Sequence, residues 1–87
     1  MGRPTGVWKM TVTVYSTPTC GYCNAAKRFL RDRHVRFREI DVSRDAHAEA
    51  EIARKTGKHS VPVIDVNGRL FVGFDPRRLA AALGVRS

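Results

Sequence analysis

Residues 12–23 of the chain read VTVYSTPTCGYC, and this stretch decides the fold. Val12 and Val14 alternate with threonine and tyrosine, a pattern typical of a β-strand because β-branched and aromatic residues favour strands and successive side chains point to opposite faces. A turn containing Pro18 ends the strand, and apolar residues at helical spacing then predict a helix over residues 21–33. Both cysteines of the chain therefore lie where a strand gives way to a helix.

The rest of the chain continues this alternation in the order β-α-β-α-β-β-α. We expect a strand over residues 35–42, a helix with Ser43 as its N-cap and Gly57 as its stop, a strand after Pro62, a hairpin turn at Asn67-Gly68, and a final helix capped by Asp75 and ended by Gly84. The fold class is thus α/β, with a four-stranded mixed sheet flanked by three helices. The first β-α-β unit should be parallel, and its first loop should lie at the carboxyl end of a central strand, where sites in α/β proteins usually form.

Length and composition fit one small domain. The 87 residues are 43% hydrophobic and 28% charged, values typical of a globular chain. We expect a flexible leader over residues 1–10 and a folded domain over residues 11–87. No apolar run approaches the roughly 20 residues that a membrane helix needs, and the leader lacks the apolar segment of a secretion signal. Two cysteines are too few for a disulfide-stabilised secreted module, so we expect a reducing, cytoplasmic compartment.

Sixteen Lys and Arg against eight Asp and Glu give a net charge of +8. This excess would suit a nucleic-acid partner, an acidic protein partner or simply a solvated surface. The basic residues gather around the end of the first helix and the second strand: Lys27, Arg28, Arg31, Arg33, Arg36 and Arg38. Of these, Lys27, Arg28 and Arg31 should lie on the wetter side of the helix. No nucleic-acid-binding motif accompanies them, so we expect no nucleic-acid partner.

Cys20-Gly21-Tyr22-Cys23 indicates a redox dithiol, because a C-x-x-C beside a β-α-β pattern is typical of one. At the start of a helix, free backbone N–H groups and the positive end of the dipole stabilise a thiolate on Cys20. Cys23 lies three residues on, on the same helix face, where it can attack a mixed disulfide formed at Cys20. Cys20 is therefore the expected nucleophile and Cys23 the resolving thiol. Half of a zinc site and two buried unpaired cysteines are the alternatives, but no second C-x-x-C or close histidine pair supports zinc.

Three segments together resemble the glutaredoxin family of the thioredoxin fold: residues 15–23 (YSTPTCGYC), residues 56–62 (TGKHSVP) and residues 72–75 (VGFD). The resemblance covers residues 11–84, and short bacterial glutaredoxin-like proteins are the most similar members. It implies that the Val61–Pro62 bond is cis, that Pro62 packs against the dithiol, and that the backbone of Val61 pairs with the substrate.

The resemblance also implies a set of residues that bind substrate or glutathione: Tyr22, Lys58, Ser60, Val61, Pro62, Gly73, Phe74 and Asp75. Asp75 matches the family's ligand for the γ-glutamyl ammonium, although it serves equally well as a helix N-cap. Two positions depart from the glutathione-dependent pattern, since Thr17 replaces a basic residue and Val72 replaces a glycine. Lys58 or His59 could supply the missing positive charge to a ligand carboxylate.

The implied activity is reduction of protein disulfides, or of mixed disulfides with small thiols, by a monomer that holds no tightly bound cofactor. Glutathione or another small thiol such as mycothiol would be a co-substrate, or thioredoxin reductase would supply the electrons. Two alternatives remain open at this point. Gly21 permits a [2Fe–2S] cluster bridged between subunits with glutathione, and Gly73-Phe74 followed by proline resembles redoxins that donate electrons to ribonucleotide reductase.

Overall fold

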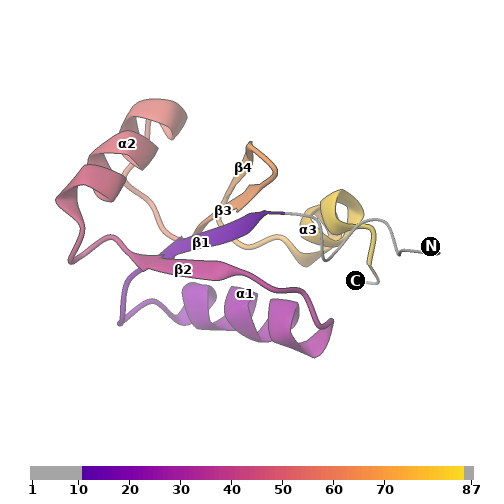
Figure 1. The fold of residues 1–87 in the computed structure, drawn as a ribbon. Coiled ribbons are helices and arrows are strands. Elements are labelled where there is room, and N and C mark those ends of the chain that lie inside the picture. The colour runs from indigo at the N-terminus through magenta and orange to yellow at the C-terminus, as the bar shows by residue number, and fades with distance from the viewer. Residues whose placement is uncertain (1–10, 86–87) are drawn as a thin grey trace.

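A computed structural model describes residues 11–85, and Figure 1 shows the arrangement of the elements. The elements are β1 (Val12–Ser16), α1 (Gly21–Asp32), β2 (Arg38–Asp41), α2 (Ala46–Thr56), β3 (Val63–Val66), β4 (Arg69–Val72) and α3 (Pro76–Leu83). The order β-α-β-α-β-β-α is the predicted one. The flexible leader expected over residues 1–10 lies outside the described residues.

The four strands form one mixed sheet in the order β2-β1-β3-β4. β1 pairs with β2 in parallel and with β3 antiparallel, and β3 pairs antiparallel with β4. Asn67 and Gly68 both have positive φ, at 52° and 94°, as the predicted tight hairpin turn requires. The sequence-based expectation of a four-stranded mixed sheet with three helices is confirmed.

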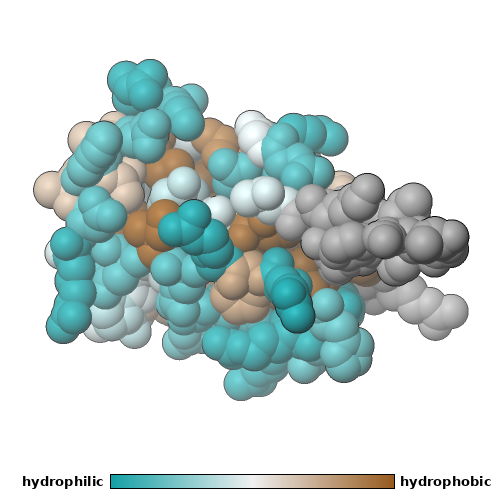
Figure 2. Space-filling model, viewed as in Figure 1, coloured by the Kyte–Doolittle hydropathy of each residue, from teal (hydrophilic) through white to brown (hydrophobic). Residues whose placement is uncertain are grey.

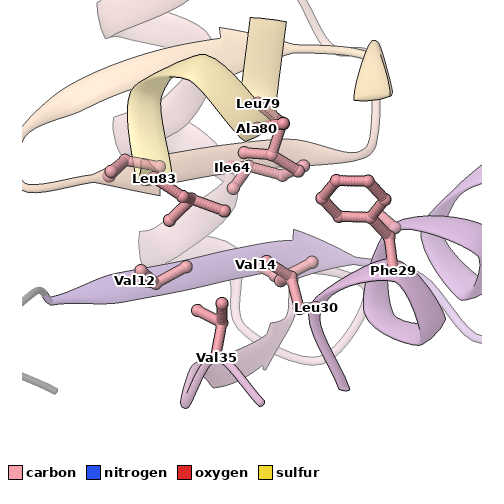
Figure 3. Close-up of a cluster of buried hydrophobic side chains, with 11 residues drawn as sticks. Val12, Val14, Phe29, Leu30, Val35, Ile64, Leu79, Ala80 and Leu83 are labelled. Carbon is pink, nitrogen blue, oxygen red and sulfur yellow. The ribbon is translucent and has the colours of Figure 1, made fainter. Parts of the chain in front are cut away.

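The main core lies between one face of the sheet and the helices α1 and α3 (Figure 3). Val12 and Val14 of β1 stand opposite Val66 and Ile64 of β3, so that all four side chains point to the same face. Leu30 of α1 and Leu79 and Leu83 of α3 pack onto these side chains and are no more than 1% exposed. Figure 1 shows α2 on the other side of the sheet from α1. The helices therefore cover both faces, as expected.

Two element boundaries differ from the expectation. The second strand begins at Arg38 rather than at Val35, and it ends at Asp41. The predicted N-cap Ser43 is wrong, because the carboxylate of Asp45 accepts the N–H of Ala48 and caps α2. Ser43 instead donates both its N–H and its Oγ–H to Asp41, which closes the turn after β2.

Strand register brings three distant loops to one end of the sheet. Tyr15, near the end of β1, is paired with Val63 at the start of β3, and Val63 is in turn paired with Val72 at the end of β4. The loop that follows β1 therefore meets two other segments at this end of the sheet: the one that precedes β3 and the one that follows β4. These are the segments that contain Cys20, Pro62 and Gly73.

Candidate functional site: a dithiol at the start of a helix

Cys20 is the N-cap of α1 and is partly exposed. Its backbone is extended, with φ −89° and ψ 114°, so that the side chain turns back over the first turn of the helix. The Cys20 Sγ accepts the backbone N–H of Cys23 at 3.1 Å. A sulfur in this position receives a hydrogen bond and the positive end of the helix dipole, and both stabilise negative charge on it.

Cys23 is fully buried in the first turn of the same helix. The pKa of its thiol is raised to about 11, mainly by burial and secondly by the side-chain hydrogen bond with Cys20. A backbone hydrogen bond with Thr17 and the charge of Lys27 act in the opposite direction. The two thiols are free and chemically distinct, since only Cys20 is open to an incoming disulfide.

Val61 and Pro62 lie beside the nucleophile. The peptide bond between them is cis, as the resemblance implies, and Pro62 is buried. The Cys20 thiol points to the carbonyl oxygen of Val61 at 3.9 Å. The N–H of Gly73 donates to the carbonyl of Pro62 at 2.8 Å, so the segment after β4 braces this loop.

A groove of about 270 Å³ runs from this loop toward α2. Its apolar side chains come from Val42, Ile52 and Val61. Its polar rim includes Thr17, Ser43, Lys58, Ser60 and the hydrogen-bonded pair of His59 Nδ1 and Glu49 Oε2, which are 2.8 Å apart. Figure 2 shows hydrophilic residues over most of the viewed face, with hydrophobic ones showing between α2 and the sheet. The predicted residues Lys58, Ser60 and Val61 are thus brought together in one groove, and Val61 also contacts Cys20.

The remaining predicted residues lie outside this groove. Gly73 and Asp75 line a second, smaller pocket of about 170 Å³ together with Arg78. The Oδ1 of Asp75 accepts the N–H groups of Arg77 and Arg78 at 3.2 and 3.3 Å, so this carboxylate caps α3. Phe74 packs edge-to-face on Phe29, with 5.7 Å between the ring centroids.

Tyr22 projects from the first turn of α1 with 72% of its surface exposed. It lies between the two cysteines in the chain, directly before Cys23, while its ring is open to solvent. It is therefore available to a molecule that approaches Cys20, and it contributes little to the core.

One group of polar residues behind the dithiol was not anticipated as a unit. The Oε2 of Glu39 accepts the Oγ–H of Ser16 at 3.1 Å and forms an ion pair with the ammonium of Lys27. The expectation that Lys27 lies on the wetter side of α1 is wrong, since its side chain is only 13% exposed. The spacing could have indicated this position, because Lys27 follows Cys23 by about one helical turn and therefore lies on the same face of the helix.

Within residues 11–85, no three His, Cys, Asp or Glu side chains converge as metal ligands would. A [2Fe–2S] cluster needs four ligands, whereas the site offers a single accessible thiol, that of Cys20. One chain therefore supplies too few ligands for a cluster, and the other ligands would have to come from other molecules. None of the helices in the described part of the chain is long and apolar enough to span a bilayer.

Comparisons with known proteins agree with this geometry. The family model for glutaredoxin matches residues 12–71. A glutaredoxin from Pseudomonas aeruginosa is 40% identical over 62 residues, which are 71% of this chain and 73% of that protein. The crystal structure of the thioredoxin-like protein BC3987 superposes with a TM-score of 0.78 at 30% identity, over 84% of this chain and all of that one.

A second solved structure is that of the glutaredoxin-like protein NrdH-redoxin from Escherichia coli. It has a TM-score of 0.73 and 31% identity, and the match covers 82% of this chain and 92% of that one. The matched family model includes both cysteines, the cis proline and most of the sheet. The chain therefore belongs to the glutaredoxin family and has a thioredoxin-like fold.

Proposed function

We propose that the chain is a dithiol oxidoreductase that reduces protein disulfides, or mixed disulfides between proteins and small thiols. The observation that carries the proposal is the pairing of a partly exposed Cys20 Sγ, hydrogen-bonded at a helix start, with a fully buried Cys23 one turn away. Cys20 attacks the substrate disulfide and forms a mixed disulfide. Cys23 then attacks Cys20 and releases the reduced product.

The groove beside Val61 is the proposed seat of the substrate. An extended segment that flanks the substrate cysteine can pair with the backbone of Val61, which places the substrate sulfur near Cys20. An apolar side chain of that segment fits over Val42 and Ile52, while Lys58 can meet a carboxylate at the rim. The proposed partners are therefore disulfide-containing proteins, and the proposed setting is a monomer in a reducing cytoplasm.

Two single substitutions test this function. Cys20→Ser is expected to abolish reduction of insulin disulfides and of a glutathione mixed disulfide, since the attacking sulfur is gone. Cys23→Ser is expected to lose protein-disulfide reduction but to accumulate a stable mixed disulfide at Cys20, visible by mass spectrometry. Full turnover by folded Cys20→Ser protein, judged by unchanged helix content, would refute the proposal.

The electron donor forms a second proposal, in which thioredoxin reductase recharges the dithiol. The supporting observations concern the glutathione pattern: Val72 stands where a glycine is expected and is 43% exposed, Thr17 replaces a basic residue, and Asp75 is engaged as a helix cap. The NrdH-redoxin, which is similar in structure, is described as having a thioredoxin-like activity profile.

A recycling assay driven by NADPH separates the donors. One arm contains thioredoxin reductase, and the other contains glutathione with glutathione reductase. We expect faster turnover in the first arm. Faster turnover in the glutathione arm would overturn this second proposal and would leave the dithiol chemistry intact. Val72→Gly is the matched variant, because it restores the glycine of glutathione-dependent members and should raise turnover in the glutathione arm.

A further inference from the structure

A charged cluster joins three elements behind the dithiol, with Lys27 largely shielded from water and Glu39 at its exposed side. It consists of Ser16 at the end of β1, Lys27 in α1 and Glu39 in β2, and we call it the Lys27 cluster. Ser16 is 1% exposed, and the side chain of Lys27 is 13% exposed. Lysine is rarely withdrawn from water to this degree unless it is paired. Glu39 supplies the pairing and fixes the position of the ammonium.

The ammonium is held on the same side of α1 as the resolving thiol. Lys27 follows Cys23 by four residues, so the two side chains are neighbours on one helix face. Helical side chains lean toward the N-terminus of their helix, which directs the stem of Lys27 toward Cys23. Arg28 and Arg31, the next basic residues of α1, are exposed. Lys27 is thus the basic residue of the helix that faces inward beside Cys23.

The resolving step needs negative charge on a sulfur that the fold hides from water. A Cys20 sulfur tied to the substrate in a disulfide cannot carry charge, and burial then remains the main factor that opposes ionisation of Cys23. We propose that Lys27, fixed by Glu39, is a positioning residue that stabilises the thiolate of Cys23 while it resolves the mixed disulfide. This inference rests on the proposed function of the dithiol.

The step balances without any further reagent. Cys23 loses its proton to solvent, and its thiolate attacks the Sγ of Cys20. The Cys20–Cys23 disulfide forms as the bond to the substrate sulfur breaks, and the departing thiolate takes a proton from water. Two electrons pass from the dithiol to the substrate. The titratable and charged groups around Cys23 and Lys27 are Cys20 at the N-cap of α1, Arg31 in α1, and Glu39 and Asp41 on β2.

The first test measures the ionisation of Cys23 with no reaction taking place. In a Cys20→Ser background Cys23 is the only thiol of the chain, and the ¹³Cβ shift of labelled cysteine reports its titration. Lys27→Gln should move the titration to higher pH, and Lys27→Arg should restore it because the charge is retained. Arg28→Gln is the matched control, since it removes the same charge from the exposed side of the helix and should leave the titration unchanged. Lys27→Met keeps the length of the stem and gives the same reading if the glutamine variant fails to fold.

The second test measures the step itself. Glutathione is attached to Cys20, and release of the thiol is followed by quenched mass spectrometry between pH 7 and 9. Because a higher thiol pKa lowers the thiolate fraction more than it raises nucleophilicity, we expect Lys27→Gln to slow release by about threefold or more. Lys27→Arg and Arg28→Gln should release at the parent rate. Parent-like titration and release in Lys27→Gln would overturn the inference, and so would equal effects of Lys27→Gln and Arg28→Gln. If Cys20 formed no mixed disulfide at all, the proposed function would fail while the titration still reported on Lys27.

Discussion

At the scale of single residues, the same burial that hides Cys23 from substrate links the ionisation of its thiol to folding. Its thiol has a pKa of about 11 in the folded chain, against an ordinary value of 9.0. Between these two values the folded chain keeps a proton that the unfolded chain has lost. The contribution of Cys23 to the free energy of unfolding is therefore fully present below pH 9, and it is lost as the pH rises toward 11.

This difference predicts alkaline destabilisation of the reduced protein. The Cys23 thiol should account for a loss on the order of 2 kcal/mol in the free energy of unfolding between pH 9 and 11. The Cys23→Ala variant should not show this part of the alkaline loss of stability. Urea unfolding of both proteins under reducing conditions, at several pH values, measures the difference. Tyr15, whose pKa is also raised mainly by burial, is present in both proteins and cancels in the comparison. Equal pH slopes in the two proteins would contradict the prediction.

The sequence shows clearly which residues can react and less clearly what surrounds them. Spacing and helix context were enough to predict Cys20 as the nucleophile and Cys23 as its partner, because both features are local. Lys27 was misplaced on the surface because an amphipathic pattern assigns every lysine to water. Its partner Glu39 lies twelve residues away on another element, and only the packing of β2 beside α1 brings them together.

At the scale of elements, the end of α1 explains why the second strand starts late. The N–H of Val35 bonds to the carbonyl of Leu30, and the N–H of His34 bonds to that of Arg31, which together form a Schellman motif. Val35 therefore reaches the core as part of the helix end, packed in the same cluster as Leu30. The alternation at residues 35–42 predicted a longer strand because Val35 would be buried either as the first residue of a strand or, as found, at the end of the helix.

His34 occupies the left-handed position of this motif, with φ 58°, which favours glycine. His34→Gly should therefore stabilise the fold by about 1 kcal/mol, measured by urea unfolding at pH 7. His47→Gly is the matched control, because His47 is exposed inside α2 and glycine there should cost roughly 0.5 kcal/mol. Destabilisation by both changes would show that the left-handed position carries no strain.

At the scale of the whole molecule, the site arises from register more than from any one segment. Cys20 and Val61 are 41 residues apart, yet the thiol of one meets the carbonyl of the other because β1 and β3 run antiparallel side by side. Composition and periodicity predicted these strands but not their pairing. The resemblance to glutaredoxins supplied that missing information, which is why the cis Val61–Pro62 bond could be expected at all.

The net charge of +8 also belongs to the molecule as a whole. A net positive charge attracts anions from a distance, and dissolved salt weakens this attraction. It therefore affects how often a substrate meets the protein more than it affects the chemistry at Cys20. Lys58, on the rim of the groove beside Val61, adds local positive charge next to the proposed seat of the substrate. The charge of a small disulfide should therefore decide how salt alters its reaction with the reduced protein.

Two disulfides of opposite charge test this expectation. Raising KCl from about 20 to 200 mM shortens the Debye length from about 20 to 7 Å, which should slow oxidation of the reduced protein by the anionic glutathione disulfide several-fold. The same change should speed oxidation by the cationic cystamine and leave the neutral hydroxyethyl disulfide almost unaffected. Rates come from quenched alkylation of the remaining thiols. If all three disulfides responded to salt in the same direction, salt would be acting on the protein itself, and the positive field would have no part in bringing substrates to Cys20.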